Sequence, residues 1–169
     1  LQRETVCPVW GWADPGAIVS VRGSWDGRTV KCKACSDGSW RVELHTGAAG
    51  GPYELQVRSG REKLTLSDIC LGEVWICSGQ SNMEMPVAGF GFQETEGTQQ
   101  ALLEAAETSS GIRIFNIKTG KKAEPQVDAD TVWTLSTPRE VAGTSAVGYF
   151  FARRLHRILG VPVGIIVNA

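Results

Sequence analysis

The chain has 169 residues, a net charge of −1 and a hydrophobic share of 42%, the composition of a globular protein with a core to bury. That hydrophobic share excludes a disordered chain, and the balanced charge excludes a basic nucleic-acid-binding arm. The longest apolar runs fall far short of the ~20 residues that a membrane-spanning helix needs. The sequence therefore predicts neither nucleic acid nor a membrane as a partner.

Short β-type runs alternate with turn residues over the first 69 positions. The turns contain Asp14-Pro15-Gly16, Asp26-Gly27 and Asp37-Gly38, which supply the fixed or positive φ angles of tight connections. This spacing predicts a small antiparallel β-sandwich domain over residues 1–69. Its predicted strands are 6–12, 17–23, 29–35, 40–45, 53–58 and 63–69.

Apolar and polar residues alternate strictly from 40 to 45. Because successive side chains of a strand point to opposite faces, Trp40, Val42 and Leu44 are expected on the buried face. His45 falls on the other face, and we interpret it as a solvent-facing residue.

After residue 69 the pattern changes to alternating strands and helices. Apolar runs at 74–77, 112–117 and 163–167 predict three parallel strands, the first of them covered on both faces. Together with the helices between them, they predict the first part of a doubly wound parallel sheet over residues 70–169. Three strands alone make a narrow and incomplete sheet.

Two helices are predicted between these strands. Residues 98–107 are rich in helix formers, and their apolar side consists of Leu102, Leu103, Ala105 and Ala106. The second helix begins after Thr144 or Ser145 as cap and ends at Gly160-Val161-Pro162. His156 points away from its apolar stripe and is interpreted as a surface residue. That stripe contains Val147, Phe151, Leu155 and Ile158.

Ligands of open parallel sheets bind beyond the carboxyl ends of the strands, so the residues after Cys77 are the first place to look for chemistry. A serine on a tight strand-to-helix turn exposes its Oγ to substrate, which makes Ser81 the candidate nucleophile. Ser78 is a weaker candidate, as is Cys77, because a thiol at the end of an apolar strand is usually buried. Alternatively, Ser81 and Glu84 fit a capping box, in which the serine only satisfies a helix N–H.

The block Leu-Gly-Glu-Val-Trp-Ile-Cys-Ser-Gly-Gln-Ser-Asn-Met-Glu-Met-Pro, residues 71–86, resembles the nucleophile block of the sialate O-acetylesterase family of SGNH-type hydrolases. It is not the Gly-x-Ser-x-Gly elbow of α/β-hydrolases, because Met83 occupies the place of the final glycine. The segments 9–16, 50–53, 145–155 and 161–164 agree with the family in kind and order. The resemblance covers essentially the whole chain.

This resemblance implies a serine esterase that removes O-acetyl groups from sialic acids or other acetylated carbohydrates through an acetyl-enzyme. Ser81 matches the nucleophile of the family, and Gln80 and Asn82 match positions that support the turn or the oxyanion site. The implied mechanism needs no metal and no cofactor. The resemblance also favours an exported protein, whether periplasmic, extracellular or lysosomal.

The general base that a serine nucleophile needs is not evident in the sequence. In the family it is a histidine of an Asp-x-x-His-like block near the end of a longer chain, and neither His45 nor His156 stands in such a block. We therefore expect these residues to be the N-terminal portion of the enzyme. The remaining C-terminal part, in a longer chain or a second polypeptide, would complete it, and the chain alone should be nearly inactive.

A hypothesis of another class is a carbohydrate-binding or interaction module. In that case the domain over residues 1–69 carries the function and Ser81 merely caps a helix. Aromatic rings can stack on sugars, and the candidates are Trp10, Trp12, Trp25 and Trp40. The alternation around Trp40 instead assigns that ring to the core.

Overall fold

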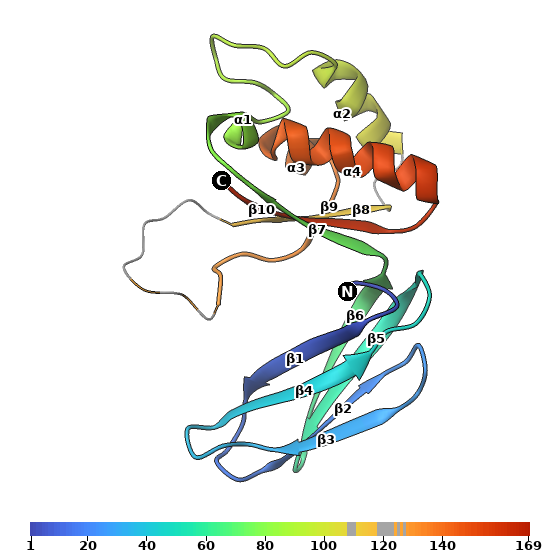
Figure 1. Cartoon of the computed structure of the whole chain (residues 1–169), viewed down its shortest axis with the longest axis vertical. Coiled ribbons are helices and arrows are strands. Elements are labelled where there is room, and N and C mark those ends of the chain that lie inside the picture. The colour runs from blue at the N-terminus through green and yellow to red at the C-terminus, as the bar shows by residue number, and fades with distance from the viewer. Residues whose placement is uncertain (108–110, 118–123, 125, 127) are drawn as a thin grey trace. The chain divides into compact units, whose positions relative to one another are not determined.

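The structure is a computed structural model that describes residues 1–107, 111–117, 124, 126 and 128–169. It divides into two compact units, Leu1–Gly72 and Glu73–Ala169 (Figure 1). The boundary follows Gly72 because the last strand of the first unit continues to Leu71. No helix among the described residues is both long and apolar enough to cross a bilayer.

The first unit contains two antiparallel sheets. One has four strands in the order β3-β2-β5-β6, and the other pairs β1 with β4. Every strand predicted for this region is present, with ends that shift by a few residues. The strands are β1 (Val6–Trp12), β2 (Ile18–Gly23), β3 (Thr29–Lys33), β4 (Ser39–His45), β5 (Gly50–Ser59) and β6 (Glu62–Leu71).

The apolar faces of the two sheets share one core. Val19 and Val21 of the larger sheet are completely buried and belong to the same cluster as Trp40 of the smaller sheet. The predicted alternation of β4 is confirmed, because its apolar residues are buried while His45 is exposed. Burial of the shared apolar face is the main term that favours folding of this unit.

The turn at Asp37-Gly38 shows why its glycine is needed. Gly38 has φ +82°, and a Cβ there would lie 2.7 Å from the carbonyl oxygen of Ala13. The Asp37 carboxylate accepts hydrogen bonds from the Ser39 hydroxyl at 2.7 Å and the Ser39 N–H at 2.9 Å. These bonds lower the pKa of Asp37 below its ordinary value.

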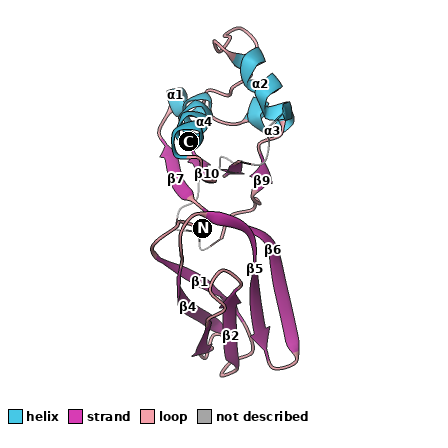
Figure 2. Ribbon diagram, turned by 90° about the vertical axis from the view of Figure 1, so that its right-hand side faces the viewer, coloured by secondary structure: helices cyan, strands magenta, loops and turns pink. Residues whose placement is uncertain are grey.

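The second unit is a mixed four-stranded sheet in the order β7-β10-β8-β9. β7 and β8 run parallel to the central β10, and β9 runs antiparallel to β8. The helices gather on one side of the sheet, as Figure 2 shows. The strands are β7 (Glu73–Ser78), β8 (Ile112–Asn116), β9 (Thr134–Leu135) and β10 (Val163–Asn168), and the helices are α1 (Ser81–Glu84), α2 (Thr98–Glu107), α3 (Pro138–Gly143) and α4 (Ala146–Leu159).

Two expectations about this sheet are wrong. β7 is not covered on both faces: it is an edge strand, and Trp75 and Ile76 are 45% and 71% exposed. An apolar run of this kind is typical of a central strand, but the run alone does not distinguish a central strand from an edge strand. The sheet also has a fourth strand, β9, whose two residues are too short to give a periodic signal.

The second long helix begins and ends where expected. Ser145 is its cap, because its Oγ accepts a hydrogen bond from the Gly148 N–H at 3.2 Å, and Gly160 ends it in the left-handed conformation. The predicted apolar stripe is wrong except at Leu155, which packs against the core cluster. Val147, Phe151 and Ile158 are exposed, and the buried residues of α4 are Ala146, Gly148, Tyr149 and Ala152.

Candidate active site

Ser81 lies just beyond the carboxyl end of β7, at the start of a helix. Two residues, Gly79 and Gln80, separate it from the last residue of the strand, and Ser81 is the first residue of α1. Its side chain is exposed. The hydroxyl is therefore open to a substrate that approaches this edge of the sheet.

The capping-box interpretation of Ser81 is wrong. The N-cap of α1 is Gln80, and no side chain caps the helix. The N–H groups of Met83 and Glu84 donate instead to the carbonyl oxygen of Gln80, at 2.8 and 2.9 Å. In a capping box the Ser81 hydroxyl would accept the Glu84 N–H, so here the hydroxyl is not used to cap the helix.

Met83 anchors α1 to the rest of the unit. Its side chain packs against the core cluster, and its Sδ accepts a hydrogen bond from the Ser145 hydroxyl at 3.2 Å. A Cβ at Gly79 would lie 3.1 Å from the Met83 Cβ, a close approach that would require one of the two side chains to shift. Met83 thus has a packing role at the position where an α/β-hydrolase elbow has glycine.

Two backbone hydrogen bonds join the segment after α1 to the start of α4. The Ala146 N–H donates to the Met85 carbonyl oxygen at 2.8 Å, and the Val87 N–H donates to the Thr144 carbonyl oxygen at 2.9 Å. Thr144 and Ser145 are both buried. The turn that carries Ser81 is therefore fixed on both sides, by β7 before it and by α4 after it.

Polar residues gather at the carboxyl ends of the parallel strands. Asn168 lies opposite Ser78, and Asn116 lies opposite Val167. The carboxamide oxygen of Asn116 accepts a hydrogen bond from the Thr144 hydroxyl at 2.8 Å, which fixes its orientation. Asn116 was not among the residues predicted for the site, although its place at the end of a predicted strand was a usable signal.

The two weaker nucleophile candidates differ in accessibility. Cys77 is buried, and a Cβ at Gly148 of α4 would lie 3.2 Å from its Sγ. Burial raises the pKa of the Cys77 thiol, which keeps it in the unreactive protonated form. Ser78 is exposed at the last position of β7.

Of the predicted supporting residues, Gln80 acts through its main chain, because its carbonyl oxygen accepts the two helix N–H groups described above. Its side chain and that of Asn82 are both exposed beside Ser81. Among the described residues, no three His, Cys, Asp or Glu side chains gather as a metal site would require.

His156, the histidine of the same unit, does not stand beside Ser81 as a base. The expectation that His156 is a surface residue is wrong: its ring is half-buried, and its Nδ1 lies 2.6 Å from the Val161 carbonyl oxygen. The ring also fills the space beside Gly111. Gly111 and Val161 precede β8 and β10, so His156 lies at the amino ends of the parallel strands, the opposite edge from Ser81.

Sialate O-acetylesterases match this chain along its whole length. The protein from Homo sapiens is 32% identical and the one from Mus musculus 31% identical, in each case over 100% of the chain. This chain is a homologue of the sialate O-acetylesterases. The resemblance found in residues 71–86 is thereby confirmed. No family model matches the chain.

A solved structure agrees with this relationship. The crystal structure of a carbohydrate acetylesterase from Xanthomonas citri matches 99% of the chain with a TM-score of 0.87 and 38% identity. The chain spans about a third of the length of these relatives: 34% of the human protein, 33% of the mouse protein and 37% of the bacterial one.

Proposed function

We propose that the full-length protein containing this chain is a serine esterase that removes O-acetyl groups from sialic acids or other acetylated carbohydrates. The observation that carries the proposal is the exposed Ser81 hydroxyl at the carboxyl end of β7, in a chain homologous to sialate O-acetylesterases. We further propose that residues 1–69 form a β-sandwich domain and that residues 70–169 are the first part of an SGNH hydrolase domain.

In the proposed reaction, Ser81 Oγ attacks the carbonyl carbon of the acetyl group and passes its proton to a base. The tetrahedral intermediate collapses, the bond to the sugar oxygen breaks, and the sugar leaves as an alcohol with that proton. Water then attacks the acetyl-enzyme and releases acetate. Each step proceeds at the carboxyl edge of the sheet, where parallel α/β sheets bind their ligands.

Gln80 and Asn82 are proposed as supporting residues of the turn and the oxyanion site. The Ser81 N–H precedes the first intrahelical hydrogen bond, whose donor is Met83 or Glu84, so the helix does not use it. We assign to this N–H the stabilisation of a negative oxygen on a carbonyl carbon bonded to Ser81 Oγ. The Gln80 carbonyl fixes the orientation of the turn by accepting both helix donors.

The base that receives the proton of Ser81 is proposed to come from the remaining C-terminal part of the protein. His156 lies at the opposite edge of the sheet, and His45 is an exposed residue of β4 in the other unit. A neutral serine hydroxyl is a poor nucleophile without a base, so the full-length protein is the expected active species.

A carbohydrate-binding module is the second candidate function, and one observation favours it. Trp10 and Trp12 are exposed on β1, at 56% and 61%. Trp40 is in the core, while the Trp25 indole N–H donates to the His45 carbonyl oxygen and its ring packs edge-on to Tyr53. Two of the four tryptophans considered for stacking therefore have structural roles.

Labelling of the full-length protein with a fluorophosphonate probe separates the two functions. We expect Ser81→Ala to abolish labelling and to reduce acetyl ester hydrolysis by on the order of 10⁴-fold or more, because the nucleophile is lost. The matched control is Ser78→Ala, which changes an exposed serine three residues away and should leave both readouts intact. Labelling that survives in Ser81→Ala would instead favour the binding module.

A further inference from the structure

The core of the first unit is open on one side. The sheet of β1 and β4 has two strands, whereas the facing sheet has four. Beside β1 lies a groove of about 330 Å³, whose wall on the larger sheet includes Leu55, Val57, Leu64 and Leu66. The smaller sheet therefore covers only part of the apolar face opposite to it.

The burial of the larger sheet decreases from its centre toward β6. Val19 and Val21 of β2 are completely buried, but Leu64 and Leu66 of β6 are 56% and 43% exposed. The strand register puts Leu64 opposite Val57, on the inner face of the sheet. Leucines on an inner face are normally buried, so these positions indicate that a covering element belongs above β6.

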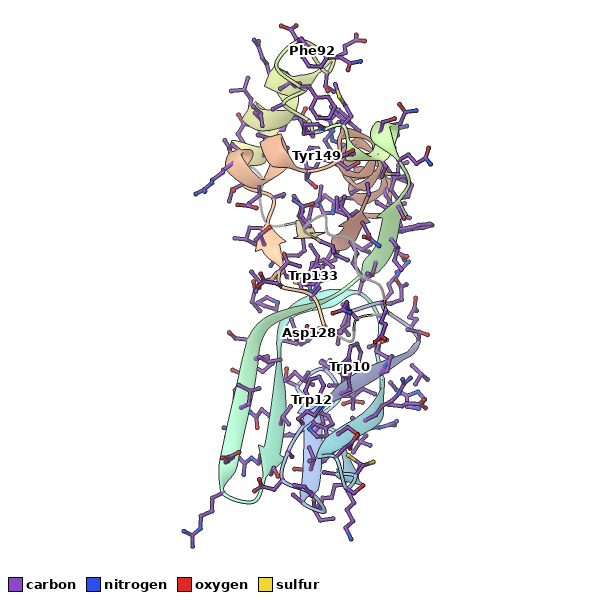
Figure 3. All side chains as sticks on the ribbon, turned by 90° about the vertical axis from the view of Figure 1, so that its left-hand side faces the viewer. Trp10, Trp12, Phe92, Asp128, Trp133 and Tyr149 are labelled. Atoms are coloured by element: carbon purple, nitrogen blue, oxygen red, sulfur yellow. The ribbon has the colours of Figure 1, made fainter. Side chains whose placement is uncertain are left out.

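The outer edge of β1 carries hydrogen-bonding groups that β4 does not use. The Ala13 N–H donates to the Gly38 carbonyl oxygen, and the Thr5 carbonyl oxygen accepts the Thr46 N–H. By the strand register, the main-chain N–H and C=O groups of the odd-numbered residues of β1 therefore point toward β4. The N–H and C=O groups of Trp10 and Trp12 consequently point to the outer edge. No strand among the described residues pairs with that edge. Figure 3 labels both tryptophans on β1.

We propose that a β-strand from the part of the full-length protein outside this chain pairs with the outer edge of β1 and covers the groove. Strands in a sheet lie about 4.8 Å apart, so a strand added beside β1 would extend the smaller sheet over β6. Such a strand would present alternate apolar side chains to Leu64 and Leu66 and bond to the main chain of Trp10 and Trp12. Pro8 has no N–H, and therefore the pairing is expected to centre on the two tryptophans.

The length of the relatives favours this occupant. The chain spans about a third of each sialate O-acetylesterase that it matches, so most of the full-length protein is available to supply a strand. The alternative occupants of the β1 edge are a second copy of the chain and a sugar stacked on the tryptophans. The hydrogen-exchange experiment below distinguishes both of them from a strand of the same protein.

The first test is hydrogen exchange of single amides in the full-length protein. We expect the N–H groups of Trp10 and Trp12 to exchange on the order of 10²-fold more slowly than those of an unpaired strand edge. Val9 and Gly11, which face β4, are the internal control and should be protected in any case. Fast exchange at both tryptophans would overturn the proposal. Protection that disappears on dilution, or that needs an added acetylated sugar, would overturn it in favour of a second copy or a ligand.

The second test uses charge on the two faces of β6. Leu64→Lys places an ammonium group in the covered groove, so we expect it to lower the melting temperature of the full-length protein by several degrees. Thr65→Lys is the matched control, because Thr65 is the exposed next residue and points to the opposite face. Equal effects of the two variants contradict the proposal. Neither measurement depends on esterase activity, so their failure would leave the proposed function standing.

Discussion

His156 and Gly111 fit together at the amino edge of the second unit's sheet. The His156 Nδ1 lies 2.6 Å from the Val161 carbonyl oxygen, which fixes the position of the ring. A Cβ at Gly111 would overlap the ring atoms. The pair therefore joins the end of α4 to the segment that leads into β8, and the space between them admits no added atom.

This fit predicts a conditional effect of Gly111→Ala. In the full-length protein we expect the variant to lose about 1 to 3 kcal/mol of unfolding free energy, because an overpacked site forces the ring or the backbone to move. In a His156→Ala background the same substitution should cost much less, since the space is then empty. Denaturant unfolding of the four proteins of this double-mutant cycle measures the difference. Equal costs in both backgrounds would show that the ring does not fill this space.

The sequence alone did not decide whether Ser81 caps the helix. The spacing of Ser81 and Glu84 fits a capping box, but that pattern does not distinguish an N-cap from the first residue inside the helix. The backbone carbonyl of Gln80 supplies the acceptor, and nothing in its side chain signals this. The nucleophile role of Ser81 stays a prediction that the labelling experiment tests.

Among the secondary-structure elements, the longer strands and the ends of α2 and α4 were predictable, whereas the buried faces of the helices and the short elements β9 and α3 were not. α2 occupies the predicted residues, yet Leu103 is exposed while Ala101 is buried. In α4 the buried face is formed largely by small residues such as Gly148 and Ala152, which let the helix approach the sheet closely. A ranking by hydrophobicity gives small residues little weight, so it placed the apolar stripe on Val147 and its neighbours instead.

α2 and α4 are joined by charged side chains as well as by apolar packing. The Glu104 carboxylate accepts hydrogen bonds from Gln100 at 2.8 Å and Arg153 at 3.1 Å, and it also bonds to Arg157. The bond from Gln100 is the largest cause that lowers the pKa of Glu104 below its ordinary value, and the two arginines lower it further. The charged form is therefore favoured in the folded state.

The direction of this shift fixes how stability should depend on pH. A carboxyl whose pKa is lower in the folded state stabilises above its unfolded pKa, ordinarily 4.5, and loses that contribution as pH falls through the folded pKa. We expect Glu104→Gln to lower the unfolding free energy of the full-length protein at pH 7 by up to about 1 kcal/mol, since the network is partly exposed. The difference from the wild type should shrink as pH falls below 4.5.

Thermal unfolding across pH measures this difference in unfolding free energy, with the exposed Glu107→Gln as control. A difference that stays constant would assign the effect to packing.

The sequence predicted that an antiparallel region precedes a region with parallel strands. It did not predict how much of each sheet face is covered by other segments. Antiparallel sheets precede a sheet with parallel strands, as the turn residues and the later apolar runs indicated. The exposed face of β7 and the open groove beside β1 depend on which segments pack there, and local patterns contain no information about such distant partners. For the same reason, the described residues of the second unit offer no base for the proposed nucleophile, Ser81.

We expect the 169-residue chain by itself to be a poor esterase. Ser81 has its hydroxyl exposed, but His156 lies at the wrong edge of the sheet to remove its proton. General base catalysis contributes about 10²- to 10⁴-fold, so the isolated chain should hydrolyse p-nitrophenyl acetate slower than the full-length protein by at least that factor. Adding the remaining C-terminal part as a separate polypeptide should restore part of the rate if the two pieces associate. Circular dichroism of the isolated chain controls for unfolding. Turnover by the folded 169-residue chain at the full-length rate would mean that a base within these residues has been overlooked.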